Sequence, residues 1–458
     1  MERERFGSRL GFLLLSAGCA IGIGNVWRFP YVVGQNGGGI FVVFYLVFLV
    51  IVGVPILTME LAVGRASKKS IIREFETLEP AGTKWHWYSP LGMLGNYVLM
   101  MFYTTVAGWM LAYFQKFAAG DFEGLSPDAV KAAFDQMLAE PLPMAAWMVF
   151  VVVLGFVICA QGLQKGVERI SKWMMLALLL LILILAVRSV TLPGGEEGLA
   201  FYLLPDAGRL GEDGLLGTVV EAMKQAFFTL SLGIGAMAIF GSYLDRDHRL
   251  MGEAVSIAAL DTFVAVTAGL IIFPACFAFG INPNSGPELI FITLPNVFNN
   301  MAAGRLWGAL FFLFMSFAAL STVLAVFENI LSCTMDLTGI SRTKACLING
   351  ALIILLSLPC VLGYNLWSDF RPLGPKTRVL DLEDFVVSTV LLPLGSLIYL
   401  LFCTHRLGWG FRACQKEANQ GKGLAMPSWL RGYLTWVLPF LVLIVLLLGL
   451  YSSLSPVL

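Results

Sequence analysis

Two stretches of this sequence place glycines beside polar residues inside long apolar runs, and these are the places where chemistry is expected. Residues 17–25 read AGCAIGIGN, and residues 229–235 read TLSLGIG. A helix interrupted in hydrocarbon leaves backbone groups that must be satisfied, so it persists only where it lines a cavity or binds a ligand. Freed carbonyl oxygens suit a sodium ion, and the amides of a half-helix suit a carboxylate. The pair favours a site for sodium and an amino acid, although glycines also let membrane helices pack closely.

Ionisable residues deep in the apolar runs are the next candidates, because burying a charge in a bilayer is costly. Asp261 lies well inside its run, and its side chain is too short to reach the interface. Arg28 and Asp384 fall near one end of their runs, where they form either an ion pair over the site or two separate interface anchors. For Glu60 and Glu328, near the opposite ends, packing against backbone amides and a functional role both stay open.

Helices that cross a membrane must position these residues. The chain has 458 residues, of which 58% are hydrophobic and 13% charged, against roughly 25% charged in soluble proteins. A span needs about 20 apolar residues, and eleven such runs are present: 10–34, 40–63, 88–117, 143–161, 170–190, 218–244, 253–280, 304–336, 343–363, 382–404 and 431–454. The remaining residues form loops, so we expect residues 1–458 to be a single transmembrane domain.

The charges and cysteines narrow the location and the class of protein. Thirty Lys and Arg balance thirty Asp and Glu, so there is no basic field for nucleic acid. The eight cysteines include no CxxC pair, so we expect them to serve as small apolar residues and not as metal ligands. Basic residues gather at 3–9, 65–73, 165–172, 342–344 and 406–422. This bias predicts an inner (plasma) membrane protein with a cytoplasmic N-terminus and an extracytoplasmic C-terminus.

The interrupted spans are the first and the sixth. A repeat of five spans inverts its orientation, so residues 10–190 and 218–404 are expected to form two inverted repeats of a transporter, with an extra helix at 431–454. An intramembrane enzyme is one alternative, but the sequence has no GxSxG or HExxH motif. A passive channel is another, because broken helices also line pores. The sequence has no GxxxxGK[ST] loop either, which argues against direct drive by ATP.

Several motifs closely resemble those of the neurotransmitter:sodium symporter family, whose bacterial members have the LeuT fold. Residues 22–31 read GIGNVWRFPY, residues 36–39 read NGGG, and residues 227–233 read FFTLSLG. Further matches lie at 55–64, 291–295, 318–322 and 381–385, so the resemblance covers nearly the whole chain through the tenth span. It implies an all-α LeuT-type 5+5 fold with eleven helices, of which helices 1 and 6 are unwound at mid-membrane. It also implies a sodium-coupled amino-acid importer that works by alternating access and is not an enzyme.

The resemblance implies ligands for two sodium ions. Those of the first site are Ala20, Asn25, Thr229 and Asp261, together with the substrate carboxylate. Those of the second site are Gly18, Ile21, Ala318, Ser321 and Thr322. All of them offer hard oxygen atoms, as sodium requires.

The same resemblance places the substrate between spans 1, 3, 6 and 8. The implied contacts are Ala20, Gly22, Gly24, Leu99, Tyr103, Phe228, Thr229, Ser231, Ile234, Thr322 and Val326. Amine-transporting relatives carry an aspartate at the position of Gly22, so the glycine favours a substrate that has its own carboxylate. The apolar lining favours a hydrophobic or aromatic amino acid, and another small carboxylate-bearing compound is the alternative.

The resemblance also implies two gates. Phe228 is expected to be a lid beneath the Arg28 and Asp384 pair. On the cytoplasmic side, Arg3 and Asp336, near Tyr243, are expected to close the path. The sequence leaves the oligomeric state open.

Two positions depart from the family pattern. Chloride-requiring relatives hold the anion with residues that match Tyr45, Gln225 and Thr229, but Asp261 stands where they carry asparagine. A fixed carboxylate there would replace the anion, so we predict chloride independence, with Asp261 as a candidate route for proton antiport. Leu176 stands where many members have a proline, ten residues after Gly166, so a break in span five is less expected here.

Overall fold

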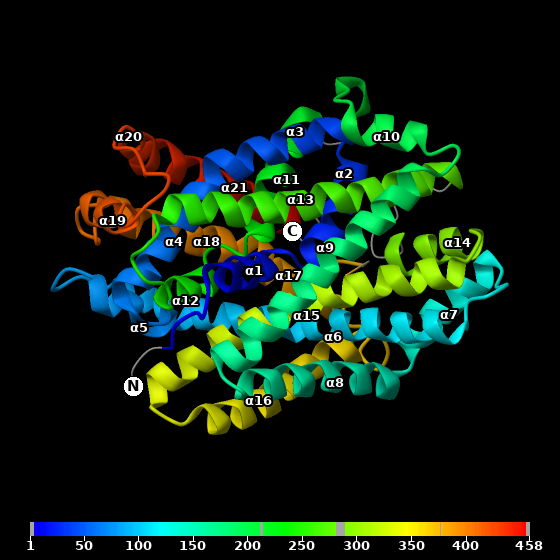
Figure 1. The fold of residues 1–458 in the computed structure, drawn as a ribbon, viewed down its shortest axis with the longest axis horizontal. Helices are drawn as coiled ribbons and strands as arrows, with labels where there is room; N and C mark the ends of the chain where they lie inside the picture. Colours follow the sequence, from blue (N-terminus) through cyan, green and yellow to red (C-terminus); the bar gives the residue numbers. More distant parts are fainter. Residues whose placement is uncertain (1–3, 211–213, 281–288, 376, 455–458) are drawn as a thin grey trace.

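The structure is a computed structural model that describes residues 4–210, 214–280, 289–375 and 377–454. In these ranges the chain is helical, and β-structure is limited to two isolated bridges, between Gly38 and Pro205 and between His248 and Lys422. Long helices run side by side along the long axis of the molecule (Figure 1). The predicted all-α membrane architecture is confirmed.

Nine helical stretches of the described chain are long and apolar enough to span a membrane. They are α3 (Gly39–Phe48) with α4 (Val54–Ser67), α6 (Ser89–Ala119), α8 (Pro141–Ala160), α9 (Arg169–Val190), α13 (Leu250–Ala278), α15 (Gly304–Thr338), α16 (Arg342–Leu362), α17 (Val379–Asp384) with α18 (Leu392–Thr404), and α20 (Leu430–Gly432) with α21 (Leu438–Leu454). The π-helical turns η2 (Leu49–Gly53), η7 (Phe385–Leu391) and η8 (Tyr433–Val437) join the paired segments. They match nine of the eleven predicted runs.

The other two runs, the first and the sixth, are interrupted helices. Helix α1 (Arg9–Ala20) is bent by 53° from the segment formed by η1 (Gly24–Arg28) and α2 (Phe29–Gln35). Helix α11 (Gly214–Thr229) is separated from α12 (Ala236–Ser242) by residues 230–235, where φ is 50° at Ser231, 96° at Gly233 and 72° at Gly235. Left-handed backbone of this kind cannot continue a right-handed helix. Both predicted breaks are therefore present.

Short helices lie at the two ends of the bundle. One end, called here the N-terminal end, holds residues 4–9, α5 (Ile71–Leu78) and α19 (Phe411–Ala418). The opposite end holds α7 (Pro127–Ala139), α10 (Glu196–Leu203) and α14 (Leu294–Asn299) (Figure 1). The remaining turns are η3 (Trp85–Tyr88), η4 (Leu163–Glu168), η5 (Ala207–Arg209) and η6 (Leu289–Thr293).

The fifth span follows the expectation for Leu176. Gly162, with φ of 91°, precedes η4, and the helix then continues through α9 to Val190. No break occurs at Leu176, where the proline typical of the family is missing.

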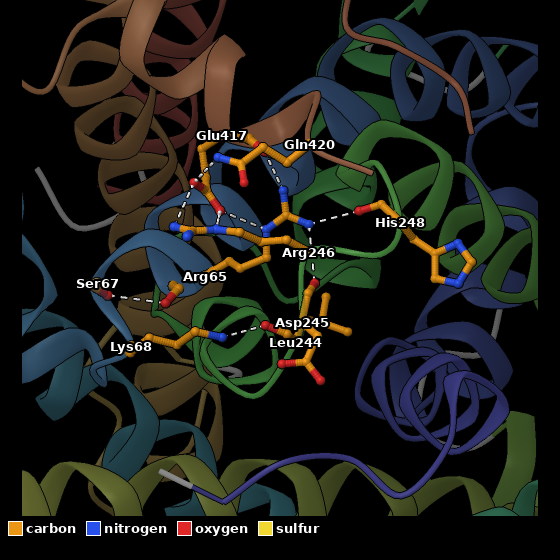
Figure 2. A network of polar contacts seen from close by, with 10 residues as sticks. Arg65, Ser67, Lys68, Leu244, Asp245, Arg246, His248, Glu417 and Gln420 are labelled. Carbon is orange, nitrogen blue, oxygen red and sulfur yellow. Dashed lines mark hydrogen bonds and ion pairs between the residues drawn. The ribbon is translucent and has the colours of Figure 1, made fainter. Parts of the chain in front are cut away.

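Buried polar contacts fasten α19 to its neighbours at the N-terminal end of the bundle (Figure 2). Arg65, at the end of α4, is fully buried; its Nε lies 2.9 Å from Glu417 Oε1, and its Nη1 donates to the His248 carbonyl at 2.8 Å. Arg246 pairs with the other oxygen of Glu417 at 3.1 Å. Lys68 donates to the Leu244 carbonyl, and burial of its ammonium lowers its pKa. The loop that leaves α12 is thus tied to α4 and α19.

Helix α12 also touches α4 at backbone distance. A Cβ added to Gly64 would lie 1.8 Å from the Ala238 carbonyl oxygen, and one added to Gly241 would lie 2.3 Å from the Leu61 carbonyl oxygen. The second half of the interrupted helix is therefore seated directly against an unbroken one.

We expect Gly64→Ala to lower the midpoint of thermal unfolding of the purified protein in detergent. The added methyl group must push α12 away from α4, and overpacking of this kind costs about 1–3 kcal/mol. Gly432→Ala is the matched control, because a Cβ at Gly432 meets nothing within 4 Å. Equal midpoints for the two variants would contradict the close contact.

Candidate functional site

A hydrogen-bonded cluster surrounds Asp261 next to the break in the first span. Asn25 Nδ2 donates to Asp261 Oδ1 at 2.7 Å. The hydroxyls of Thr229 and Tyr45 donate to Asp261 Oδ2 at 2.9 and 3.3 Å, and all four side chains are at most 1% exposed. Hydrogen bonds on both carboxylate oxygens offset part of the cost of burying the charged form. Gln225 lies nearby but donates to the Gly24 carbonyl at 3.2 Å.

A second cluster of oxygens lies between α1 and α15. Ser321 Oγ is 3.0 Å from the Gly18 carbonyl oxygen, 3.3 Å from that of Ile21 and 2.8 Å from that of Ala318. Thr322 Oγ1 lies 3.2 Å from the same Gly18 oxygen. A hydroxyl has one proton and cannot donate to three carbonyls at once. The surplus of acceptors is the arrangement that a hard cation would satisfy.

Side chains from α4, from α6 and from η3, the turn that precedes α6, hold the break in the sixth span. Glu60 accepts from the backbone amides of Gly233 and Met237 at 2.9 and 3.1 Å. Tyr88 donates to the Gly233 carbonyl at 2.7 Å, and Asn96 to the Ile234 carbonyl at 2.8 Å. Of the two roles left open for Glu60, the structure shows packing against backbone amides.

A small cavity of about 20 Å³ lies between the two breaks. Its lining includes Ala20, Gly22, Gly24, Leu99, Tyr103, Phe228, Ser231 and Thr322 from the predicted substrate contacts, and Cys19 and Leu392 besides. Three further predicted contacts, Thr229, Ile234 and Val326, are buried but do not line it. A Cβ on Gly22 would lie 2.0 Å from the Tyr103 hydroxyl oxygen. Glycine at this position thus leaves space that any larger side chain would fill.

A vestibule of about 860 Å³ opens above this cavity, toward the opposite end of the bundle. Phe228, Tyr103 and Gly24 line both spaces, so these residues separate them. The Arg28 guanidinium lies 4.6 Å from the Phe228 ring centroid, and its Nη1 is 3.9 Å from Asp384 Oδ1. Of the two roles left open for Arg28 and Asp384, the structure shows the ion pair over the site.

The predicted gate at the N-terminal end lies only partly within the described residues. Arg3 lies outside the described residues, and the Asp336 carboxylate accepts from the amide and hydroxyl of Ser70 at 2.8 and 2.7 Å. Tyr243 donates to Glu328 at 2.8 Å.

Glu328 belongs to an ion-pair network at this end that is centred on Arg342. It pairs with Arg342, which also lies 3.1 Å from Glu4. The network links the first residues of the chain to α15 and α16. The pairing of Arg342 could not be predicted from its position in the chain, because it depends on the turn that brings the start of α16 back to α15.

The helical fold, with its first and sixth spans interrupted, is that of a transporter with LeuT-type architecture. The profile of the Sodium:neurotransmitter symporter family matches residues 3–121 and 132–373. The chain belongs to this family. It is a polytopic membrane symporter that uses sodium and carries a substrate, and it is not an enzyme.

Full-length relatives agree with this assignment. An uncharacterized sodium-dependent transporter of Bacillus subtilis, YhdH, is 35% identical over 97% of each chain. One from Haemophilus influenzae is 30% identical over 98% of this chain and 99% of that protein. The sodium-dependent serotonin transporter of Drosophila melanogaster is 28% identical over 82% of this chain and 68% of its own. The crystal structure of MhsT in complex with L-phenylalanine superposes with a TM-score of 0.88, at 36% identity, over 97% of this chain and 99% of that one.

We expect Phe228→Ala to open the inner cavity to the vestibule. Cys19 lines that cavity and is 1% exposed, so the variant should react several-fold faster than the wild type with a membrane-impermeant thiol reagent added from the vestibule side. The measurement is the labelling rate, and the double variant with Cys19→Ser gives the background from the other buried cysteines. Labelling that is no faster in Phe228→Ala would mean that Phe228 does not separate the two spaces.

Proposed function

We propose that this symporter imports a hydrophobic or aromatic amino acid with two sodium ions, without chloride, by alternating access. The proposal includes a plasma-membrane location, with the N-terminal end and the N-terminus in the cytoplasm and the C-terminus outside. It also includes two inverted repeats, residues 10–190 and 218–404, with 431–454 as an additional helix.

The observation that carries the amino-acid proposal is the position of the cavity between the two breaks. Tyr103 accepts from the Ile23 amide at 2.8 Å, so its own hydroxyl proton faces the cavity side, where a substrate carboxylate can accept it. Gly22 contributes no side chain that would repel a carboxylate. The MhsT structure, which holds L-phenylalanine, matches this chain along nearly its whole length.

The walls of the cavity support an apolar side chain on the substrate. Leu99, Phe228 and Leu392 line it together with the glycines of the first break. The cavity of about 20 Å³ holds little more than a water molecule, so we infer that it widens when the substrate enters. Apolar walls of this kind favour an apolar side chain through burial, at about 25 cal/mol per Å² of surface.

Two sodium sites fit the two clusters of oxygen atoms. At the first, Asn25, Thr229 and Asp261 come together, and the Ala20 carbonyl and a substrate carboxylate would complete the shell. At the second, the carbonyls of Gly18, Ile21 and Ala318 surround the hydroxyls of Ser321 and Thr322. A membrane potential of 100 mV supplies about 2.3 kcal/mol for each sodium ion moved inward. Two ions can therefore drive steep accumulation of the amino acid.

The experiment that tests the substrate class is sodium-dependent binding of the twenty amino acids to the purified protein. We expect phenylalanine, leucine and related apolar amino acids to bind in sodium and to bind at least ten-fold more weakly without it. Charged amino acids serve as controls and should not compete. Binding only of a different carboxylate-bearing compound would reject the amino-acid assignment, and binding unaffected by sodium would reject the coupling.

We expect Asp261→Asn to make uptake depend on chloride or to abolish it. The variant removes the fixed negative charge that Asn25, Tyr45 and Thr229 surround, and a chloride ion can then supply it. The measurement is uptake into proteoliposomes with chloride or gluconate as the anion, with Asp128→Asn, at an exposed aspartate of α7, as a control outside the cluster. Unchanged uptake of the Asp261 variant in gluconate would contradict the proposal that the Asp261 carboxylate takes the place of chloride.

A further inference from the structure

Helix α17 carries a buried acid that neither the sodium sites nor the ion pair over the vestibule uses. Glu383 is 4% exposed, although Leu380, Asp381 and Asp384 on the same helix line the vestibule. Successive residues of a helix are rotated by about 100°. Glu383, rotated from Asp384 by this angle, does not line the vestibule, and its carboxyl group lies beside Cys360 of α16. Both α6 and α16 pack against α17.

Glu383 differs from the other buried acids in its lack of hydrogen-bond donors. Seven further carboxylates are buried in the described chain, and each accepts at least one hydrogen bond: Glu60, Glu74, Glu168, Glu253, Asp261, Glu328 and Glu417. For Glu383, neither carboxyl oxygen has a hydrogen-bond partner among the described residues. An ionised carboxylate without a donor or a cation is strongly disfavoured in such a place, whereas the neutral acid is tolerated.

The groups around Glu383 supply no compensating positive charge. From α16, the buried Cys360 thiol lies beside the carboxyl group, and Tyr364 follows it. Arg378 points elsewhere, with its guanidinium 5.4 Å from the Tyr364 ring centroid and Nη1 directed at the Gly363 carbonyl. No ion pair to Glu383 occurs within the ranges that the structure describes.

The remaining titratable groups of the packed elements are engaged in other contacts. On α17 itself, Asp381 accepts from the Arg378 amide at 2.7 Å and Asp384 pairs with Arg28. On α6, Thr105 lies beside Cys360 and carries no charge, while the Tyr103 hydroxyl meets the Ile23 amide. The surroundings of Glu383 therefore favour the neutral acid.

We propose that Glu383 is a proton-binding site of the transporter and holds its proton in the state seen here, with the vestibule open. One proton from the water of the vestibule joins the carboxylate to form the neutral carboxyl group, and no other bond changes. Asp261 differs from Glu383, because Asn25, Thr229 and Tyr45 donate hydrogen bonds to its carboxylate.

The position of Glu383 links its proton to the closing of the vestibule. Asp384, the next residue, is 3.9 Å from Arg28, and tightening of this pair must move α17. Such a movement changes the packing around Glu383 and hence its preference for the proton. By linkage, the proton in turn biases the closing step. This inference does not depend on which amino acid is carried.

Infrared spectroscopy of the purified protein tests the proposal without a substrate. We expect the carbonyl stretch of a protonated carboxyl group at neutral pH in the wild type, and its loss in Glu383→Gln. Asp384→Asn is the matched control from the adjacent position and should keep the band. A spectrum that Glu383→Gln leaves unchanged would overturn the proposal.

A second variant keeps the test informative if Glu383→Gln fails to fold. A neutral acid without partners can be replaced by an apolar side chain of similar length, so Glu383→Met should unfold thermally within a few degrees of the wild type. Binding of radioactive sodium should also lose most of its pH dependence in this variant. A strongly destabilised Glu383→Met protein, or one with the wild-type pH dependence of sodium binding, would contradict a neutral Glu383.

Discussion

A peptide group inside a bilayer must find its partner within the protein, and the two interrupted helices meet this requirement in different ways. In the sixth span, Glu60, Tyr88 and Asn96 satisfy the groups that the break releases. In the first span, the carbonyls of Gly18 and Ile21 meet hydroxyls that already have another acceptor. One break is therefore closed by protein, and the other offers oxygen atoms to an ion. The location of the proposed second sodium site follows from this difference.

The two breaks also contact each other, which gives a physical basis for coupling. Ser231, held in a left-handed conformation, donates from its hydroxyl to the Cys19 carbonyl at 3.3 Å. Thr229, at the end of α11, reaches the same Asp261 carboxylate as Asn25 from the first break. A ligand that orders one break therefore meets groups fixed by the other. Gly233, within the second break, donates to Glu60 of α4, and Ala238 just after the break packs against Gly64, so this helix serves as a fixed support.

Much of this arrangement could be predicted from sequence, because its signals are local. Glycines next to Asn25 and Thr229 mark both breaks, and an acid as deep as Asp261 needs partners. What could not be predicted depends on helix rotation and on long-range pairing. Ile234 and Val326 do not line the cavity, whereas Cys19 and Leu392, which were not among the predicted contacts, do.

The same limits apply at the ends of the bundle. Asp336 accepts a hydrogen bond from Ser70, and Glu328 pairs with Arg342. Only the tertiary fold brings these residues together. The isolation of Glu383 depends on a turn of about 100° between neighbours, which the sequence of charges alone does not convey. The basic loops predict which end of the bundle faces the cytoplasm, but they do not predict these contacts.

Equilibrium binding of radioactive sodium, with and without a saturating amino acid, tests most directly whether the breaks form one shared site. If the substrate carboxylate completes the first sodium shell, the amino acid should raise the affinity for sodium. Sodium should raise the affinity for the amino acid by the same factor, because binding free energies are reciprocal. A sodium affinity that none of the twenty amino acids changes would contradict the account.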